Sequence, residues 1–146
     1  MAKPAPIVVD GANIAHEEAS GGGKPKVSNL VAMRNELEKL GYDPIIIVDA
    51  SLRHDIDDQA QLEALMDRKE IRQAPAGTEA DYFVLTTAQE LEAPVVSNDR
   101  YDPYQEQFPW IRKRRIPFMI INGSVQLYWE EKLDLRNGEE GESAGA

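Results

Sequence analysis

The sequence predicts an α/β fold, a three-layer α/β/α sandwich built on a mainly parallel sheet. Short runs that are apolar throughout, such as Ile7–Val9 and Ile45–Val48, are typical of strands buried on both faces. Between these two runs, Leu30, Met33 and Leu37 recur at the spacing of one helix face. A strand, a helix and a second strand in this order form a right-handed βαβ unit, and similar alternation continues along the chain.

The remaining elements follow from apolar runs and from turn residues. Strands are expected at 7–10, 44–49, 70–73, 94–97, 117–121 and 125–128, and helices at 27–40, 59–68 and 78–91, with a short helix within 101–110. Ser28 or Asn29 is the expected N-cap of the first long helix, and Gly41 is its expected C-terminal glycine. Thr78 and Asp81 match the capping-box pattern, which gives Asp81 a structural alternative to any chemical role.

The length and composition indicate one domain. The 146 residues suffice for one hydrophobic core, which we assign to residues 1–130. Residues 131–146 are acidic and rich in Gly, Ser and Ala, so we expect a disordered tail. Neither a signal segment nor an apolar run of membrane length is found, so a cytoplasmic protein without a membrane partner is expected.

The charged and polar composition narrows the possible chemistry. The chain has no cysteine and only two histidines, which excludes disulfides, thiolate zinc sites and thiol nucleophiles, and disfavours histidine metal sites. A net charge of −10 argues against non-specific coating of nucleic acid, because phosphates are bound largely by Lys and Arg. It is compatible with a nuclease, where acid clusters hold metal ions that meet the phosphate.

Acidic residues stand where the predicted elements meet one edge of the sheet. Asp10 ends the first strand, Asp81 begins a helix, and Asp99 follows the strand at 94–97, with Asp102 just beyond. If the first and fourth strands are neighbours, these acids share the carboxyl edge, where open α/β folds bind ligands. Crowded carboxylates repel one another unless a cation lies among them, and oxygen ligands without His or Cys select Mg²⁺ or Mn²⁺. For Asp10–Gly11 alone, simple turn chemistry is the alternative.

Four segments carry a resemblance to a known family. Val-Val-Asp-Gly-Ala-Asn-Ile-Ala, Ala-Asp-Tyr-Phe-Val-Leu, Val-Val-Ser-Asn-Asp-Arg-Tyr and Pro-Phe-Met-Ile-Ile-Asn occur in this order. Together they resemble the NYN/PIN-like ribonuclease domain of the regnase type, over roughly Ile7 to Tyr128. The resemblance implies a PIN-like α/β/α fold and a metal-dependent endoribonuclease that binds RNA.

The resemblance also implies roles for individual residues. Asp10 corresponds to the first catalytic acid, Asn13 to its supporting amide, Asp81 to one of two adjacent acids, and Asp99 to the acid of the Ser-Asn-Asp segment. Lys24 lies in a loop, shared with Lys26, where related domains place a basic residue that meets RNA.

The chain departs from the family pattern in three ways. The first acid of the adjacent pair is Ala80, and the acid expected four residues after Asp99 is Pro103, although Asp102 stands one residue earlier. The zinc finger of the animal members is absent. These departures bear on the number of metal ions and on how RNA is recruited.

A basic run made of Arg112, Lys113, Arg114 and Arg115 precedes the fifth expected strand. It is either a solvated turn or a phosphate-positioning patch at the rim of the site. The sequence therefore favours a Mg²⁺- or Mn²⁺-dependent endoribonuclease acting on single-stranded or stem-loop RNA. The alternatives are a non-catalytic PIN-like domain that binds RNA or protein, and a phosphatase or flap-type DNA nuclease with the same metal chemistry.

Overall fold

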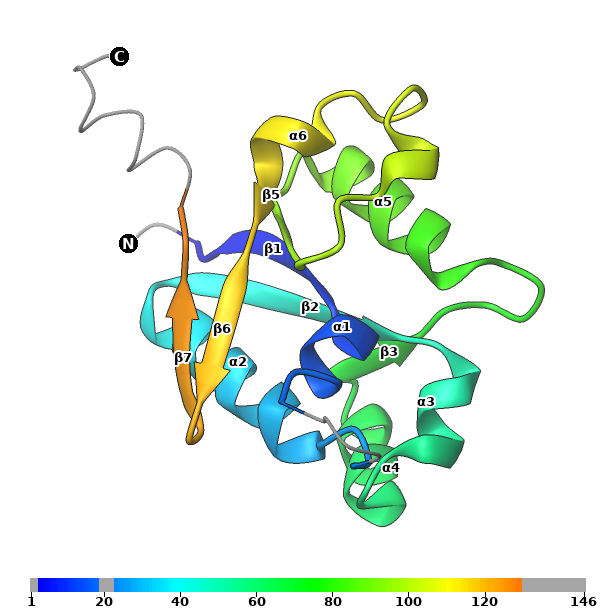
Figure 1. The fold of residues 1–146 in the computed structure, drawn as a ribbon, viewed down its shortest axis with the longest axis vertical. Helices are drawn as coiled ribbons and strands as arrows, with labels where there is room; N and C mark the ends of the chain where they lie inside the picture. Colours follow the sequence, from blue (N-terminus) through cyan, green and yellow to red (C-terminus); the bar gives the residue numbers. More distant parts are fainter. Residues whose placement is uncertain (1–2, 19–22, 130–146) are drawn as a thin grey trace.

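The centre of the molecule is a five-stranded parallel sheet with the order β3-β2-β1-β4-β5 (Figure 1). Its strands are β1 Ala5–Asp10, β2 Tyr42–Val48, β3 Ile71–Gln73, β4 Val95–Val96 and β5 Arg115–Ile116. The computed structural model describes residues 3–18 and 23–129, so the predicted tail at 131–146 lies outside the described residues. The predicted α/β class and the mainly parallel sheet are confirmed.

Helices cover both faces of this sheet and give it two separate cores. They are α1 Gly11–Ala15, α2 Val27–Lys39, α3 Ala50–Asp55, α4 Gln59–Asp67, α5 Ala80–Leu91 and α6 Ile111–Arg114, with a 3₁₀ turn, η1, at Asp102–Tyr104. Val9 packs into the core beneath α2, whereas its neighbour Val8 packs into the core beneath α5. Because successive side chains of a strand point to opposite faces, β1 contributes residues to the cores on both sides of the sheet. Within the described part of the chain, every helix is too short or too polar to cross a membrane.

Because β1 lies beside β4, the segments that follow these two strands lie next to each other. The two strands run parallel with Val9 opposite Val96, so Asp10 and Ser97 leave the sheet next to each other. The first and fourth strands are thus neighbours, which is the condition on which the shared carboxyl edge depended.

The start of α2 differs from the expected capping. Its N-cap is Lys26, which makes no side-chain cap bond, rather than Ser28 or Asn29. The Val27 amide instead donates to the carboxylate of Asp57 at 3.0 Å, so a distant segment supplies the cap. Asn29 is buried and donates to carbonyl oxygens at the end of α1. Gly41, with φ +93°, follows the helix as predicted.

The chain after β2 contains a helix that the sequence did not predict. Asp49 caps α3 by accepting a hydrogen bond from the Leu52 amide at 2.9 Å. The polar character of this segment concealed the helix, because only Leu52 among its residues is buried.

The expected fifth and sixth strands of the sheet form a separate antiparallel hairpin, β6 Phe118–Ile121 with β7 Ser124–Leu127. The fifth strand of the main sheet is the short β5, and Pro117, which lacks an amide hydrogen, separates it from β6. Asn122 and Gly123 both have positive φ, at 51° and 78°, as a tight hairpin turn of this kind requires. The predicted membership of both segments in the main sheet is therefore wrong.

Candidate active site

Asp10 is the buried centre of the carboxyl edge. Its side chain is 7% exposed, and its Oδ2 atom accepts hydrogen bonds from the Tyr101 hydroxyl at 2.6 Å and the Ser97 hydroxyl at 3.2 Å. Among the described residues, its Oδ1 atom receives only a long contact of 3.4 Å from the backbone amide of Asn13. One carboxylate oxygen is thus held by two hydroxyl donors, while the other remains available to a ligand.

The environment of Asp10 opposes its ionisation. Burial raises the pKa of this carboxyl, and the nearby charge of Asp99 adds to the rise. Hydrogen bonds from Tyr101, Asn13 and Ser97 lower the pKa but do not outweigh burial. A buried carboxyl whose charged form is disfavoured is a feature of functional sites, where a positive ligand supplies the missing compensation.

Asp81 lies at the start of α5 but does not cap it. The N-cap is Glu79, which makes no side-chain cap bond, and the helix begins at Ala80. The predicted capping box of Thr78 and Asp81 is therefore wrong, because the helix begins one residue later than that pattern requires. The side chain of Asp81 takes part in no hydrogen bond among the described residues, so capping does not account for it.

Other acids surround Asp81. Partial burial, followed in order by the charges of Asp10, Asp99, Glu79 and Asp49, raises the pKa of its carboxyl to about 6. A charge perturbs a neighbouring pKa strongly only at short range. The fold therefore brings the predicted acids Asp10, Asp81 and Asp99 to one end of the sheet, and it adds Asp49 and Glu79 to them.

The carboxylates of Asp10, Asp81 and Asp99 are ligands that suit a hard divalent cation. In this structure, however, they are not arranged around a cation site. Every donor is a carboxylate oxygen, and the mutual repulsion at Asp81 is of the kind that a cation relieves. Within residues 3–18 and 23–129, no three acidic, His or Cys side chains stand close enough together to hold a metal ion. Asp99 is exposed and Asp81 partly so, and rotation of exposed side chains between staggered conformers costs little.

The two acids after β4 have different surroundings. Asp99 accepts a hydrogen bond from the Tyr101 amide at 2.7 Å, and its own amide donates to the Ser97 hydroxyl at 3.0 Å. Asp102 lies in η1, where it accepts a hydrogen bond from Gln105 at 3.0 Å.

The side-chain amide of Asn13 binds the loop after β4 rather than Asp10 itself. Its side-chain oxygen accepts a hydrogen bond from the Asn98 amide at 2.9 Å. Asn98 in turn binds both backbone groups of Phe118, accepting from its nitrogen at 2.9 Å and donating to its oxygen at 3.0 Å. These bonds hold α1, the end of β4 and the start of β6 in one arrangement around the acids.

Four contributors escaped the sequence reasoning, one of them the Glu79 described above. Ser97 and Tyr101 bind Asp10 directly, and Asp49 adds a charge near Asp81. Asp49 had a usable signal, since it follows a buried strand adjacent to the first one. Tyr101 had none, because its inward position depends on a left-handed backbone with φ 57°, which is uncommon outside glycine.

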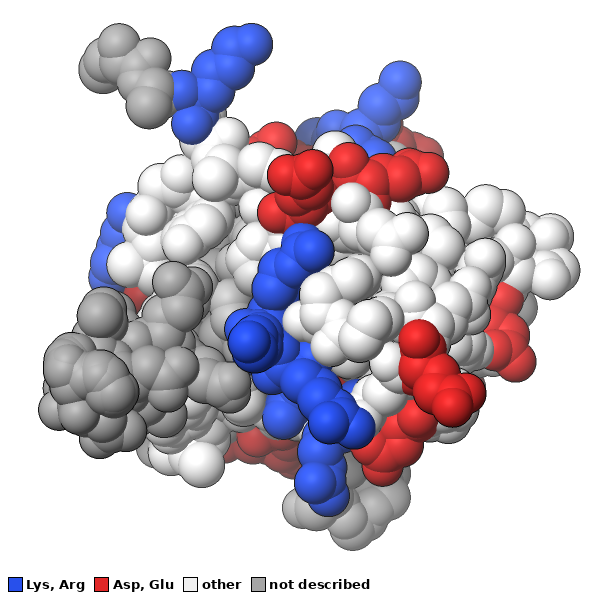
Figure 2. Space-filling model, turned by 90° about the horizontal axis from the view of Figure 1, so that it is seen from above, with Lys and Arg blue, Asp and Glu red and all other residues white. Residues whose placement is uncertain are grey.

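The predicted RNA-contacting cations fall into two groups. Lys24 is exposed and Lys26 partly exposed in the segment before α2, on the side where β1 and α1 leave the sheet. Arg112, Lys113 and Arg114 belong to α6, which leads into the first residue of β5, so they lie toward the amino edge of the sheet. Figure 2 looks down on the end where α6 lies in Figure 1 and shows a band of basic side chains across this face.

Two arginines of the basic run have structural contacts. Arg114 lies 4.4 Å from the ring centre of Trp110 and donates to the Ala93 carbonyl at 3.4 Å. Arg115 donates to the Ser97 carbonyl at 3.1 Å, which places its guanidinium near the residue that binds Asp10. Arg115 is thus the member of the run that approaches the acids.

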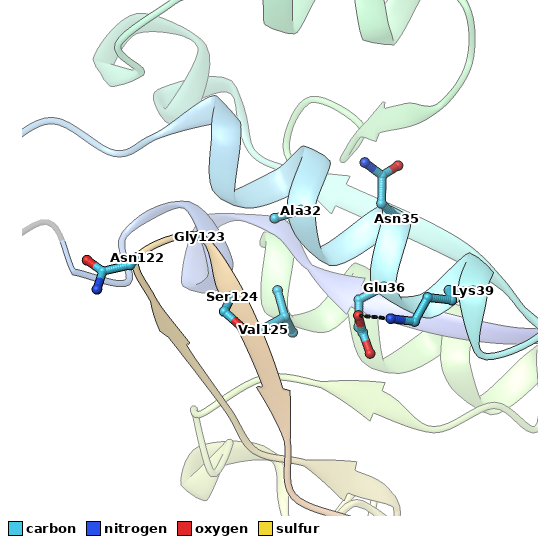
Figure 3. Close-up of a pocket in the computed structure, with 8 residues that line it drawn as sticks. All are labelled: Ala32, Asn35, Glu36, Lys39, Asn122, Gly123, Ser124 and Val125. Atoms are coloured by element: carbon cyan, nitrogen blue, oxygen red, sulfur yellow. Dashed lines mark ion pairs between the residues drawn. The ribbon is translucent and has the colours of Figure 1, made fainter.

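A pocket of about 530 Å³ lies away from the acids, between α2 and the β6–β7 turn (Figure 3). Its lining residues are Ala32, Asn35, Glu36, Lys39, Asn122, Gly123, Ser124 and Val125. The one cation in this lining, Lys39, pairs with Glu36 at 3.6 Å. The pocket therefore offers no free positive charge to a phosphate and is not part of the site.

The raised pKa of Asp81 has a consequence for stability that can be measured without any substrate. Its folded-state pKa of about 6 exceeds the ordinary value of 3.8, so the proton stabilises the folded state below pH 3.8. That stabilisation is lost as the pH rises through about 6. In urea titrations without divalent cations, we expect the stability of Asp81→Asn relative to the unmodified protein to grow between pH 4 and pH 7. A pH-independent difference would contradict the assigned burial and repulsion.

The fold and the site define an α/β domain whose parallel sheet has acidic residues at its carboxyl edge, the edge where open α/β folds bind ligands. The chain matches the model of the Zc3h12a-like ribonuclease NYN domain over residues 3–140, and it belongs to this family. Comparison with curated protein sequences found no match.

Solved structures share the fold. The crystal structure of nuclear proteinaceous RNase P 2 (PRORP2) from A. thaliana is 19% identical, with a TM-score of 0.65 over 87% of this chain and 30% of that chain. A second structure, of the Arabidopsis thaliana nuclear protein-only RNase P 2 (PRORP2), is 20% identical, with a TM-score of 0.69 over 88% and 30% of the two chains. The chain thus spans about a third of the length of these proteins. The likeness confirms the three-layer architecture.

Proposed function

We propose that this protein is a metal-dependent endoribonuclease that hydrolyses phosphodiester bonds of single-stranded or stem-loop RNA. The observation that carries the proposal is the coupled group of Asp10, Asp81 and Asp99 in a chain of a ribonuclease family. The relatives solved as protein-only RNase P are consistent with RNA as the substrate. The products would carry 5′-phosphate and 3′-hydroxyl ends.

The residues of the site have separable tasks. Tyr101 and Ser97 fix the Oδ2 atom of Asp10, which leaves Oδ1 directed to a ligand. Asp81 and Asp99 would complete the oxygen donors by side-chain rotation. A bound Mg²⁺ or Mn²⁺ would activate water and neutralise charge on the phosphate. Lys24, Lys26 and Arg115 are the cations we assign to the RNA backbone near the cleaved bond.

Removing the Tyr101 hydroxyl should impair cleavage without unfolding the protein. In Tyr101→Phe the ring still fills its buried position, but Asp10 loses its shortest hydrogen bond. Loss of a group that orients a metal ligand typically costs about 10- to 100-fold in activity or metal affinity. We expect such a fall in kcat/KM, with partial recovery at high Mn²⁺ concentration. Unchanged kinetics would remove Tyr101 from the site.

The decisive test is cleavage of a substrate panel with and without a chelator. RNA should be cut in Mn²⁺ or Mg²⁺ and not in EDTA, whereas single-stranded DNA, a DNA flap and a phosphomonoester should remain intact. Cleavage of RNA in EDTA would overturn the mechanism, and cleavage of DNA or the monoester alone would assign another substrate.

A non-catalytic binding domain is the second candidate. The spacing of the acids in this structure favours it, as does Ala80 in place of an acid. It predicts that Mn²⁺ leaves the thermal unfolding temperature unchanged. The endoribonuclease predicts a rise in that temperature, because a ligand that binds only the folded state stabilises it.

A further inference from the structure

A second pocket adjoins the acids at the start of α5. It has a volume of about 300 Å³ and is lined by Gly77, Thr78, Glu79, Tyr82 and Tyr104. Glu79 and Tyr82 lie on either side of Asp81 in sequence, and the charge of Glu79 acts on Asp81. The Tyr104 hydroxyl donates to Glu79, and the charge of Asp81 also acts on Tyr104. A ligand in this pocket would therefore lie beside the proposed cleavage site.

Two aromatic rings form the walls of this pocket. The rings of Tyr82 and Tyr104 lie 6.4 Å apart at 43°, and both contact the buried ring of Phe108. Tyr82 remains 39% exposed although it is a large aromatic residue on a helix that packs against the sheet. Phe108 thus supports a ring whose own surface is open to solvent. This is the arrangement of a stacking platform.

The charge of the lining selects the part of a nucleic acid that fits. The lining contains a carboxylate and no Lys or Arg, so it would repel a phosphate. A nucleobase is uncharged and stacks on aromatic rings, and N–H groups on its edge can donate to a carboxylate or hydroxyl oxygen. Glu79 and Thr78 supply such oxygens in the lining of the pocket.

We propose that this pocket binds one unpaired nucleobase of the RNA, stacked on Tyr82, next to the phosphate that is cleaved. The proposal rests on the proposed ribonuclease function and adds a substrate requirement to it. A base in a duplex is stacked and paired on both sides, so only single-stranded or looped RNA can present one to this platform. The pocket therefore accounts for a preference for unpaired RNA.

The test uses the fluorescence of 2-aminopurine, which is quenched when the base stacks on an aromatic ring. The full chain carrying Asp10→Asn, so that RNA stays intact, is titrated into short single-stranded RNAs with 2-aminopurine at one position at a time. We expect additional quenching at one position only. Tyr82→Leu, which keeps the apolar bulk but loses the ring, should abolish that quenching and weaken binding roughly tenfold. Tyr82→Phe should retain both.

Tyr128→Leu is the matched control, because Tyr128 is a similarly exposed tyrosine, 45% exposed, that follows β7 and is outside the pocket. The Tyr128→Leu variant should quench 2-aminopurine and bind RNA like the Asp10→Asn protein without it. Binding without position-specific quenching, equal quenching in Tyr82→Leu, or no RNA binding at all would overturn the base pocket. Failure of the ribonuclease proposal is read separately, from the absence of cleavage by the protein with Asp10 intact.

Discussion

Replacing Asp10 by asparagine is expected to lower RNA cleavage by about 10³-fold, because a bound metal supplies several kcal/mol of transition-state stabilisation. The amide keeps the size of the side chain and one oxygen, but it removes the charge that would hold the cation. Single-turnover cleavage of a labelled RNA in Mn²⁺ measures the loss. Residual activity within a factor of ten of the unmodified protein would exclude Asp10 as a ligand.

The same variant should be at least as stable as the unmodified protein. The Asp10 carboxyl is buried and its pKa is raised, so its ionised form costs stability at neutral pH. The neutral amide removes that cost and the repulsion from Asp99. Stability sacrificed for activity is a recurrent property of functional sites. Urea unfolding in EDTA tests this point, and marked destabilisation would indicate a structural role instead.

A matched control distinguishes the loss of Asp10 from the general effect of removing one negative charge. Asp43 lies near the start of β2, opposite Pro6, and is exposed at the other edge of the same sheet. Asp43→Asn makes the same chemical change and the same change in net charge. It should leave cleavage within about twofold, since exposed charges beyond a Debye length are largely screened.

The arrangement of the acids was predictable because it depends on general rules of parallel sheets. Buried apolar runs fixed the strands of Asp10 and Asp99, and the adjacency of β1 and β4 placed both acids at one edge. No local rule of that kind governs the loop after β4. Its path depends on the left-handed Tyr101 and on the side chain of Asn98, which takes the place of a strand partner for Phe118.

The hairpin β6–β7 illustrates a different limit. Asn122–Gly123 is a strong hairpin signal, yet the sequence predicts that the strand before it belongs to the main sheet, because its apolar pattern suits either place. Burial alternates along β6, with Phe118 and Ile120 inside and Met119 and Ile121 outside. That pattern belongs to a sheet covered on one face only, which distinguishes the hairpin from the central strands.

Replacing Gly11 by alanine is expected to destabilise the protein by about 3 kcal/mol, at the upper end of overpacking effects. A Cβ atom at Gly11 would lie 2.7 Å from the Ile47 carbonyl oxygen and 2.6 Å from a methyl group of Val48. The carbonyl belongs to a central strand and cannot move aside as a flexible side chain can. Gly11 is therefore required for the close approach of α1 to β2. A typical domain is stable by only about 5–15 kcal/mol, so the loss is large.

Urea unfolding at neutral pH measures the effect, and Ala12→Ser is the control, because it adds one atom to the next, partly exposed residue of the same helix. Equal stability of Gly11→Ala and the unmodified protein would show that α1 can shift without cost. Such a shift would also displace Asp10, the residue before Gly11, whose Oδ2 atom depends on hydroxyls from Ser97 and Tyr101. Folded Gly11→Ala should consequently cleave RNA more slowly, so the glycine links close packing of the sheet edge to the position of the proposed metal ligand.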